Sequence, residues 1–243
     1  IPASLVGSEM CIRDSIYAEF AENAAAVSVV KGIKSANERF AGATTTYSIE
    51  AMMKDMKALQ AGTSHELGQN FSKAFEIQYS DENNELQHPF QTSWGVSTRL
   101  IGMIIMAHGD DKGLQLPPNL APTQSVLIPI IPNEDSKSIV LETVNNLHEE
   151  LRKDYRIKID DRDNISPGFK FNEWELKGVP LRIEIGPKDI ENNSVVFSRR
   201  DGVNGKSSIS IDDVSQKLIE NLDDIQSNLL ETSKNFRKEN TIH

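Results

Sequence analysis

Arg99 is the residue whose position most clearly requires a chemical partner. It opens the apolar segment RLIGMIIMAH, residues 99–108, whose pattern predicts a helix. A helix N-terminus carries partial positive charge from unpaired N–H groups and aligned peptide dipoles, so a cation there is locally unfavourable. Either a neighbouring carboxylate or a bound phosphate, held jointly by the helix end and the guanidinium, would offset Arg99. Local physics leaves both alternatives open.

A second group of polar side chains lies upstream, crowded beside glycines around the segment TSHELGQNF. Gly62 and Gly68 would let a ligand approach the backbone closely. The polar residues that could form a hydrogen-bonding floor for a small polar ligand are Gln60, Thr63, Ser64, His65 and Gln69. The alternative is a polar turn with a satisfied histidine. The sequence has no serine-elbow motif, no phosphate loop of the GxxxxGK type and no HExxH motif.

His108, Asp110 and Asp111 carry side chains of the kinds that bind metal ions. They come at the C-terminal end of the predicted helix, where a histidine complements the helix dipole and a glycine ends the helix. We therefore expect no metal site there. The chain has one cysteine, Cys11, which excludes an internal disulfide framework and a cysteine-cage metal site.

The densest mixture of charged side chains lies in GFKFNEWELKGVPLRIEIGPKD, residues 168–189. Glutamate can accept hydrogen bonds from base amino groups, and arginine or lysine can donate to guanine O6 and N7. Single-stranded RNA exposes those base edges. The run could read bases, or it could form cross-strand ion pairs on a solvated sheet. The residues concerned are Glu175, Lys177, Arg182, Lys188 and Asp189.

The bulk composition limits the class of protein. The chain has 243 residues, which is enough for two domains with separate cores. Its 38% apolar and 26% charged content is ordinary for a globular protein, and no apolar run approaches the roughly 20 residues of a membrane span. The net charge of -10 argues against unspecific coating of nucleic acid. The single cysteine suits a reducing, cytoplasmic compartment.

The first half of the chain predicts an antiparallel sheet closed by a helix. Residues 1–15 show no helical or strand period that continues past residue 15, and we interpret them as a spurious leader. A helix comes next, with apolar Ile16, Phe20, Ala24 and Val27 at helical spacing, and it runs into a short buried stretch, VSVV. Strands are then predicted in residues 40–53, 75–80 and 89–94, before the helix that Arg99 opens. Strands joined by turns favour antiparallel pairing.

The second half reads as an α/β domain, beyond a proline-rich linker near residues 113–124. A helix capped by Ser136 is predicted to bury Ile139, Val140, Val144, Leu147 and Leu151. Predicted strands flank it at 125–131, 155–160, 180–186, 194–200 and 208–211. A strand, a helix and a strand at this spacing imply a parallel pair. The last predicted element is an amphipathic helix over residues 212–236.

Several long strings resemble one family, the prolyl-tRNA synthetases of the archaeal and eukaryotic-like type. They are FAGA, SIEA, LQAGTSHELGQNFSKAF, TSWGVSTRLIG, MAHGDDKGLQLPPNLAP, GFKFNEWELKGVPLRIEIGPKD and SRRD, collinear within residues 16–237. The resemblance implies part of a class II antiparallel-sheet catalytic domain, then an α/β anticodon-binding domain with a mixed five-stranded sheet. The implied boundaries are 16–120, 121–208 and a C-terminal helix in 209–243.

The resemblance also implies roles for individual residues. WGVSTR looks like motif 3 of class II synthetases, whose arginine binds the ATP γ-phosphate, so Arg99 takes that catalytic place. Gln60 and Thr63 fall where the family contacts the nucleotide. The implied proline pocket contains Phe40, His65, Trp94 and Gly95. The implied anticodon contacts are Glu175, Arg182, Lys188 and Asp189.

The implied chemistry is ATP-dependent activation of proline, usually with Mg²⁺, and transfer of the prolyl group to tRNA(Pro). The intact family is homodimeric. Motifs 1 and 2 and the C-terminal domain, often zinc-binding, are not found in this sequence, so it resembles an interior fragment that we expect to be inactive alone. The alternative is an anticodon-binding module without catalysis. If the ATP site is incomplete, Arg99 should be exposed or paired with a substitute partner.

Overall fold

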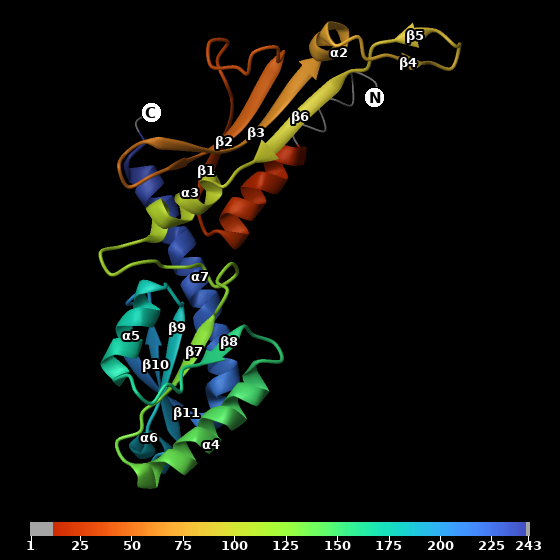
Figure 1. Ribbon diagram of the computed structural model, residues 1–243. Coiled ribbons are helices and arrows are strands. Elements are labelled where there is room, and N and C mark those ends of the chain that lie inside the picture. The colour runs from red at the N-terminus through yellow and green to blue at the C-terminus, as the bar shows by residue number, and fades with distance from the viewer. Residues whose placement is uncertain (1–11, 242–243) are drawn as a thin grey trace. The chain divides into compact units, whose positions relative to one another are not determined.

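The computed structural model describes residues 12–241. The chain divides into two compact units (Figure 1). The first unit extends to residue 107 and includes the chain from Ser233 onward, and the second spans residues 108–232. Within the described residues, no helix combines the length and the apolar character that crossing a membrane requires.

The first unit is built on a four-stranded antiparallel sheet, as predicted. Its order is β1 (Val29–Ile33), β2 (Thr45–Met52), β3 (Ala58–Gly68) and β6 (Gln91–Val96). The polar segment TSHELG lies inside β3, so its interpretation as a turn is wrong. Pairing on both sides, with β2 and β6, satisfies the backbone of β3 and overrides the local turn preference of its glycines.

A helical segment covers one face of β3. Residues 12–19 are helical and continue into η1 (Phe20–Ala24), so residues 12–15 of the predicted leader belong to this helix, while residues 1–11 lie outside the described part. The Ser64 hydroxyl donates to the buried Asp14 carboxylate over 2.9 Å. Gly62 leaves room for Tyr17, whose ring lies 3.1 Å from the site of a Cβ at that glycine.

Two of the apolar residues at helical spacing, Ile16 and Phe20, are 47% and 43% exposed, whereas Val27 and Val29 of the predicted buried stretch are buried. The residues that the helical segment buries are Asp14, Ala21 and Ala25. Asp14 and Tyr17 are side chains of this segment that contact β3, while Ile16 and Phe20 are exposed.

The rest of the first unit differs in part from the prediction. It comprises α2 (Asn70–Ala74), the hairpin of β4 (Tyr79–Ser80) and β5 (Leu86–Gln87), and α3 (Arg99–His108). The helix α2 was not predicted, and only Tyr79–Ser80 of the predicted strand 75–80 is a strand. The loop of this hairpin is the acidic segment 81–85. Hydrogen bonds from the backbone N–H groups of Glu85 and Asn83 lower the pKa of Asp81 in this loop.

The second unit has the predicted mixed five-stranded sheet, ordered β11-β10-β9-β7-β8. The central β7 pairs in parallel with β8 and β9, and β10 pairs antiparallel with β9 and β11. The strands are β7 (Ser125–Pro129), β8 (Ile157–Ile159), β9 (Leu181–Ile185), β10 (Ser194–Arg199) and β11 (Lys206–Ser210).

Helices cover both faces of this sheet (Figure 1). The larger core joins α4 (Glu134–Leu151) and α7 (Val214–Glu239) to Leu181, Ile183 and Ile185 of β9. On the other face, Phe171 and Trp174 of α5 (Pro167–Leu176) pack on Val126 and Ile128. Alternation along β9 therefore directs Arg182 and Glu184 to the α5 side. The short elements are α6 (Pro187–Glu191) and η2 (Ile211–Asp213).

Two details of α4 differ from the prediction. The helix begins at Glu134 and is capped by Asn133, whose side chain accepts from the backbone N–H of Ser136. Ser136 is thus inside the first turn. Ile139 is 51% exposed, whereas Val140, Val144, Leu147 and Leu151 are buried as predicted.

The segment after α3 is anchored on the end of α5 in the second unit. The backbone N–H groups of Leu114 and Leu116 donate to the carbonyls of Leu176 and Gly178. A Cβ at Gly178 would lie 2.6 Å from that of Leu114, and its φ of +73° is one that favours glycine. Further along, the Arg156 guanidinium binds the Ala121 carbonyl. These contacts fix the predicted linker segment 113–124 to the second unit.

Candidate functional site

A hollow of about 330 Å³ lies in the first unit, where β3, β6 and the start of α3 meet. It brings together six of the seven residues predicted there to bind ATP or proline. These are Gln60, Thr63, His65, Trp94, Gly95 and Arg99. They come from two strands and a helix start, because antiparallel pairing sets Gly95 opposite Thr63 and the chain enters α3 directly after β6.

Arg99 is the first residue of α3, and it is exposed. The Ser97 hydroxyl accepts its backbone N–H, which satisfies one of the free donors of the helix start. Its Nη1 donates to the Gln60 carbonyl over 3.4 Å, a long hydrogen bond. Among residues 12–241, no carboxylate lies within ion-pair distance of Arg99. Arg99 is thus exposed, one of the two outcomes expected if the ATP site is incomplete, and the neighbouring carboxylate of the first alternative is not found among these residues.

His65 has a fixed orientation in this hollow. Its Nδ1 lies 3.0 Å from the hydroxyl of the buried Thr46, which stands directly opposite on β2. That hydroxyl also accepts the backbone N–H of Phe40. When the hydroxyl proton is directed at Nδ1, all three groups are satisfied and the ring keeps its proton on Nε2. Burial lowers the pKa of His65, which favours this neutral form.

Phe40 is half exposed and packs on the His65 ring, with the ring centroids 4.9 Å apart. Phe40 is the seventh of the residues predicted to bind ATP or proline. It adjoins the hollow by packing on His65, which lines it. The row of rings continues from Phe40 to Phe71 and Phe75. An apolar wall therefore adjoins the polar groups of β3.

Trp94 and His65 belong to opposite faces of the sheet. Residues directly opposite each other on paired strands share a face, and β3 pairs Ser64 with Trp94 and His65 with Ser93. The Trp94 ring accordingly lies under the Arg13 guanidinium, 4.3 Å from the ring centroid. Trp94 is at the rim of the hollow, while Thr63, His65 and Ser93 are on the face that opens into it.

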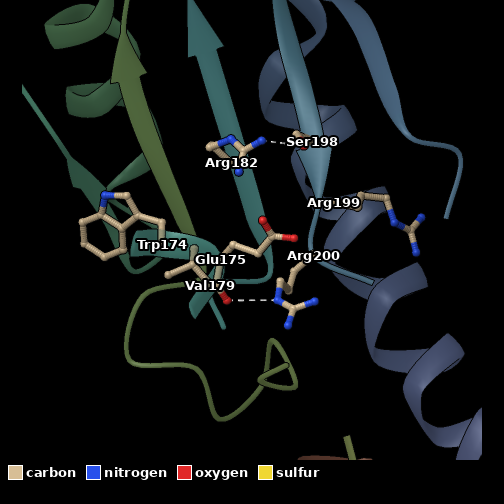
Figure 2. A pocket seen from close by; sticks show the side chains of 7 residues that line it. All are labelled: Trp174, Glu175, Val179, Arg182, Ser198, Arg199 and Arg200. Carbon is tan, nitrogen blue, oxygen red and sulfur yellow. Dashed lines mark hydrogen bonds between the residues drawn. The ribbon is translucent and has the colours of Figure 1, made fainter. Parts of the chain in front are cut away.

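A second, smaller cavity of about 40 Å³ lies in the second unit (Figure 2). It contains Glu175 and Arg182, two of the four residues predicted to contact RNA bases. The others around it are Trp174, Val179, Ser198, Arg199 and Arg200. The Glu175 carboxylate pairs with Lys112 at 3.3 Å, and its backbone carbonyl accepts Arg200 Nε at 3.0 Å.

Arg182 is held by groups on β9, β10 and α5. Its Nε donates to Glu184 over 2.9 Å, and its Nη2 donates to the Ser198 hydroxyl over 3.0 Å (Figure 2 shows the second contact). The guanidinium carbon lies 4.3 Å from the centroid of the Phe171 ring. The contacts with Glu184 and Ser198 fit the interpretation of this charged run as ion pairs within the sheet. The position of Arg182 beside a cavity fits the other interpretation, in which the run contacts bases.

Lys188 and Asp189 lie apart from that cavity, in α6 beyond the carboxyl end of β9. The Asp189 carboxylate accepts the Gly186 backbone N–H over 2.9 Å and so caps its own helix. Lys188 is exposed. The four predicted RNA contacts therefore form two pairs, separated along the length of β9.

Both halves of the chain match known family models. Residues 9–108 match the class II tRNA synthetase core domain of the G, H, P, S and T type, and residues 124–221 match an anticodon-binding domain. The proline–tRNA ligase of Roseiflexus sp. (strain RS-1) is 53% identical over 96% of this chain and 49% of its own length. That of Alkaliphilus oremlandii is 56% identical over 93% of this chain and 46% of its own length.

A solved structure shows the same architecture. The prolyl-tRNA synthetase of Cryptosporidium parvum, complexed with L-proline and AMP, is 42% identical and superposes with a TM-score of 0.88. The match covers 97% of this chain and 51% of that one. This chain belongs to the prolyl-tRNA synthetase family.

The chain spans about half the length of the synthetases it matches. The core-domain match ends at His108, the last residue of α3, so the hollow around Arg99 lies wholly within it. The cavity beside Arg182 lies within the anticodon-binding match.

Sequence reasoning missed three residues that contact the predicted site residues: Thr46, Ser198 and Glu184. Thr46 lies in TTTYS, where nothing local distinguishes it from its neighbours, and only the pairing of β2 with β3 sets it against His65. Ser198 opens the string SRRD that carried part of the resemblance, yet its contact with Arg182 depends on the β9–β10 register. Glu184 has the i, i+2 spacing from Arg182 that puts both on one face of a strand, and this spacing could have identified it.

Proposed function

We propose that this chain forms part of a proline–tRNA ligase, which activates proline with ATP to prolyl-adenylate and transfers the prolyl group to tRNA(Pro). The observation that carries this proposal is the convergence of Gln60, Thr63, His65 and Arg99 on one hollow, with Phe40 stacked beside it. These groups match the parts of the two substrates: donors and a cation for phosphate, and an apolar ring wall for the proline ring.

The proposed nucleotide contacts are Gln60, Thr63 and Arg99. The guanidinium at the helix start adds its charge to the partial charge of the helix, and both attract the γ-phosphate. Its long bond to the Gln60 carbonyl is weak enough to be exchanged for a phosphate oxygen.

The proposed proline contacts are Phe40, His65 and Gly95. The resemblance also implied Trp94, whose ring lies on the other face of the sheet, under Arg13, so we place it at the rim of the pocket only. The half-exposed Phe40 ring gives the pyrrolidine an apolar surface, and His65 Nε2–H supplies a donor. Gly95 faces Thr63 across the two strands and keeps the site open, since nothing lies within 4 Å of the place of its missing Cβ.

In the proposed reaction, a proline carboxylate oxygen attacks the α-phosphorus of ATP. A new P–O bond forms while the bond to the bridging oxygen breaks, and pyrophosphate leaves with that electron pair. A hydroxyl at the tRNA 3′ end then attacks the proline carbonyl carbon, AMP leaves, and the hydroxyl loses its proton. Positioning and charge stabilisation suffice for such steps, so no protein nucleophile is needed.

Mg²⁺, the metal usually used in this chemistry, would neutralise charge on the ATP phosphates. Residues 12–241 contain no cluster of three or more acidic, histidine or cysteine side chains able to hold a metal ion. We therefore assign no residue of this chain to holding Mg²⁺.

Arg99 is the one arginine or lysine among the described residues lining the hollow. A triphosphate carries several negative charges, so we expect the purified 243-residue chain to bind ATP weakly and to lack proline-dependent ATP–pyrophosphate exchange. Exchange above the rate of an Arg99→Ala variant would overturn that expectation.

An anticodon-binding module without catalysis is the second candidate function. It is favoured by the second unit, which has its own sheet and its own core, and which presents Glu175 and Arg182 at a cavity. Lys188 and Asp189 complete the proposed contacts to the guanines of the proline anticodon. Binding to a stem-loop with that anticodon, compared with one whose guanines are replaced by adenine, tests this at fixed salt concentration. Equal affinities would reject specific reading.

We propose that the intact protein forms the homodimer expected of its family, and that it acts in the cytoplasm, where tRNA is charged. Sedimentation of the intact protein tests the first point. A monomer at the concentrations where it is active would contradict it.

A further inference from the structure

Glu184 is a buried carboxylate that joins two cations in the second unit. It is 6% exposed and lies on β9, two residues after Arg182. One oxygen accepts Arg182 Nε at 2.9 Å, and the other accepts Lys206 Nζ at 2.6 Å from β11. The Arg182 side chain is 15% exposed, whereas that of Lys206 is 55% exposed. Burying the Glu184 carboxylate beside Arg182 carries a desolvation penalty, and an apolar side chain at position 184 would often serve stability equally well. Stability alone therefore does not explain this cluster.

The cluster fixes the plane of the Arg182 guanidinium. Glu184 holds the Nε side, and Ser198 on the neighbouring strand holds Nη2. The Phe171 ring stacks beneath, 4.3 Å from the guanidinium carbon, and Lys206 Nζ lies 5.3 Å from the same ring centroid. An arginine held on two sides and one face loses little further rotamer freedom when it binds a ligand.

The donors that remain suit a guanine. Arginine has five N–H groups, and the hydrogen bonds within residues 12–241 use two of them, at Nε and Nη2. Two N–H groups on Nη1 and one on Nη2 remain. A pair of parallel donors on adjacent nitrogens matches the O6 and N7 acceptors of guanine. With two cations and one carboxylate, the cluster also keeps a net positive charge toward RNA.

We propose that Glu184 is a positioning residue for base recognition: it holds Arg182 so that its free Nη donors meet guanine O6 and N7 together. The inference rests on the proposed anticodon reading, and it adds which atoms of Arg182 read the base and what holds them. Glu184 itself touches no RNA.

The test compares affinities of the whole chain for three RNA stem-loops that carry guanine, 7-deazaguanine or adenine at each anticodon guanine in turn. 7-Deazaguanine lacks the N7 acceptor and keeps O6. At the position that Arg182 reads, we expect the wild-type chain to prefer guanine over 7-deazaguanine by about tenfold. In Glu184→Gln the guanidinium loses its charged anchor, and we expect this preference to fall below about threefold.

The preference ratio separates positioning from general stability, since a merely structural role would weaken binding of both RNAs alike. Glu220→Gln is the matched control, because Glu220 also accepts a 2.6 Å bond from a lysine, Lys217, on the exposed surface of α7. It should keep the full ratio. If Glu184→Gln does not fold, Ser198→Ala is tested in its place. It removes the hydroxyl that accepts from Arg182 Nη2 and changes the side-chain volume little.

The outcomes distinguish the two proposals. A wild-type chain that binds guanine and adenine stem-loops equally refutes anticodon reading itself. A wild-type chain that discriminates, with a folded Glu184→Gln keeping the tenfold preference, overturns the positioning role alone. A reduced ratio in Glu184→Gln with the control unchanged supports it, and where Glu184→Gln does not fold, the ratio in Ser198→Ala decides in the same way.

Discussion

Asp110 and Arg200 form a two-point ion pair across ninety residues of sequence. Arg200 Nη1 donates to Asp110 Oδ2 at 3.0 Å, and Nη2 donates to Oδ1 at 2.5 Å. The same guanidinium donates through Nε to the Glu175 backbone carbonyl. This pair ties the segment after α3 to the end of β10 and to the end of α5, so Glu175 depends on it for its position.

Replacing Asp110 tests the strength of this tie. Arg200 holds the pKa of Asp110 well below its ordinary value. A lowered pKa stabilises the fold above the ordinary value of 3.8, and that contribution is lost as the pH falls below it. The Asp110 side chain is 35% exposed, so solvent screening reduces the effect. We expect Asp110→Asn to lower the free energy of unfolding at pH 7 by about 1 kcal/mol.

Urea unfolding at pH 7 and pH 3 measures this contribution. Asp111→Asn is the matched control, since Asp111 is the next residue along the chain and its side chain is exposed and outside the ion pair. The difference between the two variants should shrink at pH 3. An Asp110→Asn variant as stable as the control at pH 7 would contradict the assignment.

Comparing alanine substitutions at Gly178 and Gly202 tests the close contact between Gly178 and Leu114, which anchors the segment after α3. The φ angles of the two glycines are +73° and +74°, so alanine suffers the same backbone strain at both, about 1–2 kcal/mol. A Cβ at Gly178 would meet Leu114, whereas nothing lies within 4 Å at Gly202. We expect Gly178→Ala to destabilise the second unit by a further 1–3 kcal/mol, roughly the cost of overpacking. Thermal unfolding of both variants measures the difference, and equal losses would show that the contact relaxes freely.

Arg99 should distinguish ATP from AMP, because its proposed target is the γ-phosphate. We expect Arg99→Ala to weaken ATP binding by about tenfold and to leave AMP binding within twofold, as expected for one charge-assisted contact. Calorimetric titration of the isolated chain with each nucleotide gives the two affinities. Lys57→Ala is the control, since it removes an exposed cation of the same unit. Equal losses for ATP and AMP would place Arg99 elsewhere on the nucleotide.

His65 should make the first unit less stable in weak acid. Burial lowers its pKa below 6.5, so the unfolded chain takes up this proton first. The stability that the neutral ring contributes is present above pH 6.5 and declines as the pH falls through the folded pKa. We expect His65→Gln to reduce the loss of stability between about pH 7 and pH 5. NMR titration of the ring checks the premise directly, and a midpoint at or above 6.5 would contradict it.

Much of the fold was predictable from local pattern, above all in the second unit. The strands at β7, β9 and β10 are continuous apolar or alternating runs between turns, and α7 has a strict three- and four-residue apolar spacing. These signals agree with the tertiary structure, so the prediction succeeded. The cap of α4 was misplaced because Asn133 and Ser136 are both good capping residues, and only the backbone at Asn133 is extended.

The fold of the first unit was harder to predict because its strands contain residues whose local preference is for turns. β3 carries Gly62, Ser64 and Gly68, which favour turns when taken alone, and pairing with two neighbours overrides them. The buried face of the helix at residues 12–24 is set by the shape of β3, so apolar content at Ile16 and Phe20 misled the prediction.

Residue types and spacing singled out most of the site residues, the resemblance implied their roles, and the contacts among them depend on register. No spacing in the sequence sets Thr46 opposite His65, or Ser198 opposite Arg182, because strand alignment is a property of the whole sheet. Likewise, no spacing in the sequence indicates that Asp110 lies against Arg200.

The opposite orientation of His65 and Trp94 has a consequence for how this sequence can change. From Gly62 to His65, residues facing the hollow alternate with residues facing the helix of residues 12–24, as Thr63, Ser64 and His65 do. Inserting one residue between Gly62 and Thr63 would exchange the two sets, turning the buried serine outward and the histidine inward. This part of the strand can therefore accept many single replacements, yet a one-residue change in its length would dismantle the hollow and the interior together.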